Sequence, residues 1–558
     1  MALPYKIVDV NTATWSDYKN SFCAVHNAIK EMRNSSSDGS IALGNSVEYA
    51  ALRFQTGQFG PMLSVYVYAD KVGSPTFTVS CELYADNGSG EPDLSNKLAS
   101  AVSLPASQFP TTARLVLFTF LVQYPILSDT TYHVVFKASA AGDASNHVRL
   151  YKKASGSLVG GTGGPPNTGT RAFGSSTWTY PSPQDILRCA VFMEGTHLLA
   201  VGVDKTNNKI RAYRSTDGGV TWAEVSSASA PACSTTSGYK NVQVQQSLKT
   251  TYDPILAVFV PTATDTFNFY THDNTTGGTG WGSLGSAATS AINADGSGNV
   301  PEFSGRRLNG DSLIAHQGLT ETVMGAARRR VKVQRPLDSF GLIDVVGSPN
   351  SPISATQPGT ATHYDLRLAF MDMEDRFHIF FSASDSNQIQ HRVLKADNTF
   401  ESVNTLGSTA AVCSNTSAYP IGLGCNYFKD EAWRIAIPYL DSTSGTIKVA
   451  HCNASESHLA ASWTIEQVSA DAPEVATSNL GFLTADSQQS AKLVLFYVKS
   501  DDTIWMTNDG GTGTWTTPAQ WRSGQTVAGV SGFTVASAIN LMYLDTAPTP
   551  DELKFDRL

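Results

Sequence analysis

Three acidic residues in one short stretch are the side chains best spaced for acid–base chemistry. Asp372, Glu374 and Asp375 stand in the sequence M-D-M-E-D-R-F, a polar connection between two apolar runs. Hydrolysis of a glycosidic bond needs two carboxyl groups about 5–10 Å apart, one donating a proton and the other acting as nucleophile or base. Carboxylates of a solvated turn give the same pattern, so both interpretations stay open. No metalloprotease, serine-hydrolase, P-loop or dinucleotide-binding motif occurs in a suitable context, and we expect neither a cofactor nor a metal ion.

Positive charge is concentrated in one region of an otherwise acidic chain. The arginines concerned are Arg306, Arg307, Arg328, Arg329 and Arg330. They are candidates for binding an anionic glycan, nucleic acid or an acidic partner, and a solvated strand at a rim is the alternative. The formal net charge of −9 argues against a nucleic-acid-binding protein as a whole, which would carry a basic footprint. We therefore expect no nucleic-acid partner.

Composition indicates which elements position these side chains. Charged residues make up only 16% of the 558 residues, whereas Gly, Ser, Thr and aromatic residues are frequent, which favours an all-β protein of several domains. The seven cysteines are scattered without a C-x-x-C pair, so buried free thiols are expected. The first twenty residues lack the pattern of a secretory signal, and the longest apolar run, 113–127, is too short to cross a bilayer. Synthesis in a cytoplasm without membrane insertion is the expectation.

The N-terminal segment 1–40 contains the one apolar pattern of helical period. Thr14 and Asp17 resemble a capping box at its start. The apolar positions, at spacings of three and four, are Trp15, Tyr18, Phe22, Val25, Ile29 and Met32. The spacing predicts an amphipathic helix over 15–32. Its seam would serve docking and homo-oligomerisation in an assembly, or pack on the following domain.

Residues 41–155 read as a β-sandwich. Apolar alternation is clear at 62–69, 77–85, 113–122 and 131–139, with polar or Gly/Pro turns between these runs. The run S-V-Y-V-Y-A-D-K-V-G-S-P-T-F-T-V-S-C-E-L-Y-A-D, followed by G-E-P and T-T-Y-H-V-V-F, resembles the choice-of-anchor or carbohydrate-binding-like jelly-roll domains of phage tail and bacterial surface proteins. The resemblance implies attachment or sugar binding rather than catalysis.

After a Gly-rich linker at 156–174, the chain from 175 to 558 reads as one repeated unit of about 60 residues. Its second and third strands recur at 198–215, 255–273, 377–395, 434–451, 492–509 and 539–558. One interval is twice as long, so a further copy is expected between 301 and 342. Four short strands per repeat predict a β-propeller of seven blades, or six if a weak copy forms no full sheet. The segment 176–181, S-T-W-T-Y-P, reads as an orphan strand that completes the last blade.

One corner of the repeat carries a specific motif, S-T-D-G-G-V-T-W at 215–222. It matches every fixed position of the Asp-box of sialidases and related β-propellers, and it resembles that family over roughly 172–558. The matching residues are Ser215, Asp217, Gly219, Thr221 and Trp222, with a second, imperfect copy at Asp509 and Trp515. In that family the box staples a blade corner away from the catalytic face, so the resemblance implies fold and not activity.

Sialidase chemistry also needs three arginines converging on a carboxylate. The arginines of this chain cluster in one repeat, which argues against that activity. Together these features predict a non-catalytic phage virion protein, of a tail, fibre or capsid attachment. It would contact other virion proteins through its N-terminal helix and bind a glycan of the host surface. A glycoside hydrolase acting on host polysaccharide is the alternative.

Overall fold

The computed structural model is all-β. It describes most of 36–154, 167–204 and 364–557 with short gaps, and elsewhere mainly the strands themselves. Within these residues, regular structure is strand apart from three 3-10 turns at Ala106–Gln108, Ala454–Glu456 and Ala460–Ser462. None of the described elements is a helix with the length and apolar character needed to cross a bilayer.

The chain forms two units that differ from the predicted domains. One is 28–196, and the other combines 1–27 with 197–558. The expected boundaries at 40 and 174 shift because strands on either side of the predicted sandwich pair into its sheet. β3 (Ile29–Asn34) pairs with β16 (Cys189–Glu194), and β15 (Asp185–Leu187) pairs with β13 (His147–Ala154). The Gly-rich stretch at 156–174 therefore lies within the first unit.

Unit 28–196 is one curled sheet in the order β3-β16-β6-β13-β4-β5-β12-β7-β8. Its remaining long strands are β4 (Gly39–Leu43), β5 (Val47–Gln55), β6 (Gly60–Val72), β7 (Thr78–Asp86), β8 (Pro92–Ser100), β10 (Arg114–Thr119), β12 (Thr131–Ala138) and β14 (Asn167–Ala172). Four of these strands, β6, β7, β10 and β12, confirm the alternating runs read from the sequence. Phe118 of β10 contacts Phe136 of β12 at 5.4 Å although the two strands do not pair, so the curl closes over an apolar core. Jelly-roll connectivity stays a prediction.

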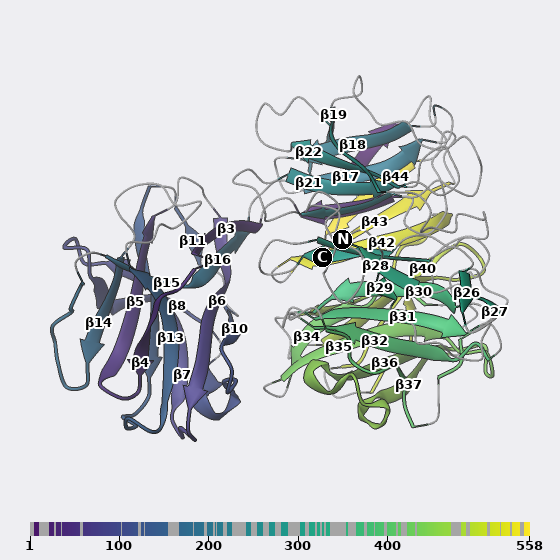
Figure 1. The fold of residues 1–558 in the computed structure, drawn as a ribbon. Coiled ribbons are helices and arrows are strands. Elements are labelled where there is room, and N and C mark those ends of the chain that lie inside the picture. Colours follow the sequence, from purple (N-terminus) through teal and green to yellow (C-terminus); the bar gives the residue numbers. More distant parts are fainter. Residues whose placement is uncertain are drawn as a thin grey trace. The chain divides into compact units, whose positions relative to one another are not determined.

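In the second unit the described residues form the two-stranded sheet β26-β27 (Glu321–Val323, Ala326–Arg328) and seven four-stranded antiparallel sheets. Figure 1 labels strands of several of these sheets. The sheets are β2-β17-β18-β19 (Phe22–His26, Leu198–Asp204, Lys209–Ser215, Ala223–Val225), β20 to β23 (Val242–Gln246, Pro254–Phe259, Phe267–Asp273, Trp281–Ala287), β24-β25-β28-β29 (Glu302–Arg306, Ser312–Gln317, Val331–Gln334, Ile353–Ser354), β30 to β33 (Tyr364–Met371, Phe377–Ala383, Ile389–Leu394, Asn404–Thr405), β34 to β37 (Cys425–Lys429, Ala432–Leu440, Ile447–Asn453, Thr464–Ser469), β38 to β41 (Phe482–Asp486, Lys492–Val498, Ile504–Asn508, Ala519–Gln520) and β42-β43-β44-β1 (Val527–Val535, Ala538–Asp545, Glu552–Arg557, Tyr5–Asp9). Every repeat read from the sequence, including the weak copy after 301, has its sheet.

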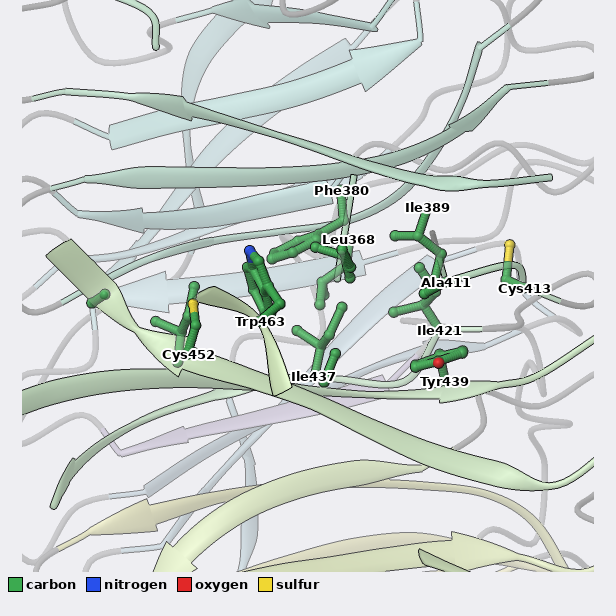
Figure 2. Close-up of a cluster of buried hydrophobic side chains, with 14 residues drawn as sticks. Leu368, Phe380, Ile389, Ala411, Cys413, Ile421, Ile437, Tyr439, Cys452 and Trp463 are labelled. Carbon is green, nitrogen blue, oxygen red and sulfur yellow. The ribbon is translucent and has the colours of Figure 1, made fainter. Parts of the chain in front are cut away.

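Neighbouring sheets are joined through their first strands, as in a propeller. β2 contacts β20, β20 contacts β24, β24 contacts β30, β34 contacts β38, β38 contacts β42, and β42 returns to β2. Between the sheets of β30 and β34 an apolar cluster makes the joint, with Leu368 and Phe380 on one side and Ile437 and Trp463 on the other (Figure 2). Such short sheets bury both faces only when stacked between neighbours, which explains their many fully buried residues.

The predicted N-terminal helix is wrong. Phe22–His26 forms β2, paired with β17, and Ile29–Asn34 forms β3, paired with β16, while Trp15 and Tyr18 lie outside the described residues. The stretch F-C-A-V-H is uncharged, as suits a strand with sheets on both sides, and a dense apolar run satisfies helical spacing by coincidence. Val25, Ile29 and Met32 therefore do not form a helical docking seam.

The predicted closing strand is also wrong. The last sheet is completed by β1, whose Tyr5 pairs with Phe555, and not by 176–181. Thr179 instead bridges Thr170, and Trp178 packs on Tyr49 within unit 28–196. Segments 5–9 and 176–181 are both short runs that could serve as edge strands. The sequence alone does not determine which of them pairs with the free edge of β44. The ring is thus closed by the first residues of the chain.

Candidate functional site

Asp372, the predicted catalytic residue that the structure describes, is buried at the corner between β30 and β31. Its side chain is 1% exposed. Arg376 donates its backbone N–H to Oδ1 and its Nε–H to Oδ2, both at 2.8 Å, and His378 Nε2 lies 3.0 Å from Oδ2. Burial acts to raise the pKa of Asp372, but the charge of Arg376 and the hydrogen bond from His378 outweigh it and lower the pKa to about 2. Glu374 and Asp375 lie outside the described residues.

A chain of hydrogen bonds leads from Asp372 into the next sheet. His378 Nδ1 lies 3.0 Å from His391 Nε2, and His391 Nδ1 lies 3.1 Å from the carbonyl oxygen of Ser457 and 3.2 Å from Oδ1 of Asn404. Both histidines are fully buried, and their rings stack with an interplanar angle of 8°. The chain therefore joins the corner of β31, the middle of β32 and the loop after β36.

The groups around His391 place one of the protons of this hydrogen-bonded network. The carbonyl of Ser457 only accepts, and Asn404 donates Nδ2–H to that carbonyl, so its Oδ1 faces His391 as an acceptor. His391 Nδ1 therefore carries hydrogen, and one proton is shared between His391 Nε2 and His378 Nδ1. Burial, followed by the neighbouring His378, lowers the pKa of His391 well below its ordinary value. Asp372, which accepts two hydrogen bonds from Arg376, thus acts as a buried counter-ion of that guanidinium.

Corner tryptophans pack each sheet on the preceding one, as the Asp-box resemblance implies. Trp463 lies edge-on to Phe380 at 5.9 Å and donates Nε1–H to Ser457 O at 3.0 Å. Trp515 donates to Glu466 of the preceding sheet at 2.9 Å, and Trp222 contacts Phe555 of the last sheet at 5.4 Å. These three tryptophans are structural.

The Asp-box carboxylate has the same structural role. Asp509 Oδ1 accepts from Leu493 N–H at 2.9 Å and so ties its corner to the start of β39. In the other box, Ser215 is buried and Thr221 is exposed, while Asp217 and Gly219 lie outside the described residues.

The predicted basic group stays a prediction. Arg306 ends β24 and Arg328 ends β27 (Ala326–Arg328), a strand paired with β26 (Glu321–Val323). The side chains of both, and all of Arg307, Arg329 and Arg330, lie outside what the structure describes.

A surface cluster on unit 28–196, which sequence reasoning missed, has the better-defined geometry. It consists of Tyr68, Asp70, Arg149, Tyr151 and Arg188 and is called the outer cluster below. Along β6 the residues Val65, Val67 and Ala69 are fully buried, so the alternate residues project from the opposite face. Tyr68 N–H donates to Arg188 O, and Arg188 N–H donates to Tyr151 O, both at 2.8 Å. The backbone of Arg188 is thereby fixed between β6 and β13.

Charge and aromatic surface alternate across the outer cluster. The guanidinium of Arg188 lies 3.6 Å from the ring centroid of Tyr68, which contacts Tyr151 edge-on at 5.3 Å. Asp70 is saturated, because Arg149 donates to its two oxygens at 2.7 and 2.6 Å and Tyr151 Oη donates at 3.0 Å. Burial, followed by this hydrogen bond, raises the pKa of Tyr151, so its hydroxyl stays protonated at neutral pH.

Arg188 and Tyr68 are members of the outer cluster with unused hydrogen-bonding capacity. Within the described part of the chain, no hydrogen bond or ion pair engages its guanidinium, and none engages the hydroxyl of Tyr68. The guanidinium of Arg188 lies over the ring of Tyr68, has free N–H donors and stands near the second ring of Tyr151. This arrangement suits a ligand that offers hydroxyl or carboxylate oxygens to the donors and apolar C–H faces to the rings. Asp70 is the one carboxylate among the five residues of the cluster, so the cluster lacks the pair of carboxyl groups that glycoside hydrolysis needs.

Part of this cluster was visible in the sequence. The run S-V-Y-V-Y-A-D alternates Val with Tyr, which puts the tyrosines on the face opposite the core once the strand is assigned. The position of Arg188 could not be predicted from the sequence, because it depends on a backbone contact with Tyr68, which is more than a hundred residues away in the chain.

Five described cysteines, Cys81, Cys189, Cys413, Cys425 and Cys452, are free thiols, and all except the partly buried Cys425 are buried. The described residues contain no group of three potential metal ligands.

Comparison with known proteins gave structural likeness alone. No family model matches the chain, and no curated protein matches it in sequence. Among solved structures, the BP39L lectin from Burkholderia pseudomallei is 13% identical over 65% of this chain and 92% of its own, with a TM-score of 0.46. The Aleuria aurantia lectin, with a six-bladed β-propeller fold, is 15% identical over 58% of this chain and 91% of its own, with a TM-score of 0.34. The Hadza microbial sialidase Hz136 is 12% identical over 95% of this chain and 97% of its own, with a TM-score of 0.33.

Proposed function

We propose that this protein is a non-catalytic glycan-binding protein and that the outer cluster of unit 28–196 contacts the sugar. The observation that carries the proposal is the guanidinium of Arg188, fixed on Tyr68 at 3.6 Å with its N–H donors unengaged by described residues. Sugar hydroxyls accept hydrogen bonds from such donors, and the C–H faces of sugar rings pack against aromatic surface. Tyrosine and arginine also dominate the energy of binding sites because they combine apolar area with polar groups.

The hydrolase alternative has no comparable support. Asp372 is enclosed by Arg376 and His378, and Asp70 is held by Arg149 and Tyr151, so neither carboxylate is free to transfer a proton. Release of reducing sugar by the protein would nevertheless contradict the non-catalytic assignment.

The setting we propose is a phage virion, with the seven sheets of the second unit forming a seven-bladed propeller. The sandwich-like unit would present its outer cluster to a host-surface glycan. Co-sedimentation of the protein with purified particles would support this setting, and its recovery only as free protein after infection would contradict it. An assembly role does not rest on an N-terminal helix, because the described part of that segment forms β2 and β3.

Glycan binding is tested with the full chain on immobilised bacterial capsular, wall and lipopolysaccharide glycans. Truncating a central arginine of a binding site costs at least about 1.4 kcal/mol, so Arg188→Ala should weaken binding about tenfold or more. The matched control is Lys499→Gln, which removes a cation stacked on Trp505 at 3.9 Å in the other unit. Equal binding by wild type and Arg188→Ala, or no binding by wild type to any of these glycans, would reject the outer cluster as the site.

A further inference from the structure

A second group of unengaged donors lies on unit 28–196, in a row across four neighbouring strands. Arg171 on β14 is paired in register with Tyr49 on β5, Tyr49 with Lys137 on β12, and Lys137 with Ser80 on β7. Directly opposed residues of adjacent strands project from the same face, so the four side chains form one line. These four residues are called the donor row.

Aromatic rings hold the two cations of the donor row in place. The guanidinium of Arg171 lies 4.1 Å from the ring centroid of Tyr49 and 5.7 Å from that of Trp178, and the ammonium of Lys137 lies 5.2 Å from Tyr49. Tyr49 and Trp178 are themselves packed edge to face at 6.0 Å. Arg171 is therefore oriented by stacking and not by a carboxylate, which fixes it before any ligand arrives.

The positive charge of the donor row is uncompensated. Within the described residues, neither Arg171 nor Lys137 makes an ion pair or a side-chain hydrogen bond, and Nε of Arg171 is a buried donor without an acceptor. Glu82, two positions from Ser80 on β7, is already engaged by Tyr84 Oη at 2.6 Å and Lys97 Nζ at 3.3 Å. Two like charges on one ring repel each other, and an anion placed beside both relieves that repulsion.

We propose that the donor row is an oxyanion site, which binds a carboxylate or sulfate group through Arg171, Lys137 and the hydroxyl of Tyr49. The guanidinium offers paired N–H donors in the geometry of such groups, and the ammonium and the hydroxyl add further donors on the same line. The site is separate from the outer cluster, because it lies on β14, β5, β12 and β7 rather than on β6 and β13. An acidic polysaccharide and a free oxyanion share this chemistry.

Binding is measured with the full chain against four probes: sodium sulfate, sulfated heparin, carboxylated hyaluronan and neutral dextran. The site predicts binding of the acidic probes that weakens with salt, and no comparable binding of dextran. Lys137→Gln should weaken the binding of the acidic probes about fivefold, since one ion pair of this kind is worth about 1 kcal/mol. Tyr49→Phe, which removes only the hydroxyl, should weaken it by a smaller factor.

Lys153→Gln is the matched control, because it removes the same charge from a partly exposed position on β13 of the same sheet, where its partner is the exposed Asp38. It should change the binding of acidic probes less than twofold. An equal loss in Lys153→Gln and Lys137→Gln would assign binding to overall charge and overturn the proposal, as would unchanged binding in Lys137→Gln.

Two further comparisons separate the sources and the sites. Tighter binding per site of heparin or hyaluronan than of sulfate identifies a polysaccharide as the ligand, and equal binding identifies a free oxyanion. Arg188→Ala should leave the effect of Lys137→Gln intact. If Arg188→Ala alone abolishes the binding of acidic probes, the donor row is rejected while the outer cluster stands.

Discussion

Replacing Asp372 by Asn tests whether this carboxylate is a structural counter-ion or a catalyst. The substitution keeps the shape of the side chain but removes the negative charge between Arg376 and His378. Arg376 is 14% exposed and His378 is fully buried, so neither side chain regains much hydration when its partner is lost. The amide nitrogen of Asn also cannot accept the N–H bonds that one carboxylate oxygen receives.

The expected cost is that of breaking a buried ion pair by removing one partner, about 3–5 kcal/mol of the free energy of unfolding. The cost should fall on the second unit, which contains this network. Glu401→Gln is the matched control, because Glu401 pairs with Lys395 at 3.6 Å near the same sheet but both side chains are about one-third exposed. Such a surface pair contributes about 0–1 kcal/mol.

Urea unfolding followed by tryptophan fluorescence measures both variants, since Trp463 lies 5.4 Å from His391 and reports on the network. A loss below about 1 kcal/mol in Asp372→Asn, or one equal to that of Glu401→Gln, would refute the buried counter-ion. A hydrolytic activity lost in Asp372→Asn at unchanged stability would instead restore the catalytic interpretation.

Three further outcomes follow from described contacts. Burial lowers the pKa of both His391 and His133, so below about pH 6.5 the unfolded chain binds protons that the folded chain does not. The free energy of unfolding should therefore fall with falling pH, by up to about 1.4 kcal/mol per pH unit for each histidine. Thermal unfolding between pH 7.5 and 5 measures this fall, and an unchanged stability over this range would contradict the lowered pKa values. Trp463→Ala opens a cavity against Phe380 and should cost about 3–5 kcal/mol in urea unfolding, whereas a loss below 1 kcal/mol would mean that the joint repacks. Deleting residues 1–9 removes β1 and exposes the edge of β44, so the truncated protein should aggregate on size-exclusion chromatography, and a stable monomer would show that β1 is dispensable.

The repeat was predictable because its signal is local. Each copy has an apolar second strand followed by a turn and an alternating third strand. In six of the seven sheets these two strands form a hairpin, and in the remaining sheet β26 and β27 lie between β25 and β28. The same locality explains the tryptophan corners, since Trp463 and Trp515 stand at one place in the repeat and pack on the preceding sheet. Periodicity therefore predicted the strands and the corner position of the tryptophans, whereas the sheet on which each tryptophan packs is known from the structure.

The errors concern pairings between distant parts of the chain. A strand such as Phe22–His26, apolar on both faces, has no period that separates it from a helix, and only its partner β17 decides. Two segments, 5–9 and 176–181, could each have completed the last sheet. Which of them pairs with β44 depends on the arrangement of all the sheets and not on local sequence. The same distinction applies to the candidate site. Tyr68 could be placed on the outward face of its strand from the sequence, whereas Arg188 is positioned by its backbone contact with β13 and Arg171 by the pairing of β14 with β5.

The position of unit 28–196 within the chain explains how so long an insertion is compatible with a closed ring. The unit interrupts one sheet between β2 and β17, where His26 pairs with Leu198. Within the inserted unit, Ile29 near its first residue pairs with Glu194 near its last residue. Folding of the unit therefore brings its two termini together. Closing a loop as long as the insertion costs about 3 kcal/mol more than closing one of about five residues, from the logarithmic dependence on loop length. Folding of the insertion removes that cost from the pairing of β2 with β17. Because β2 precedes the insertion and β17 follows it, the sheet that contains both depends on this pairing.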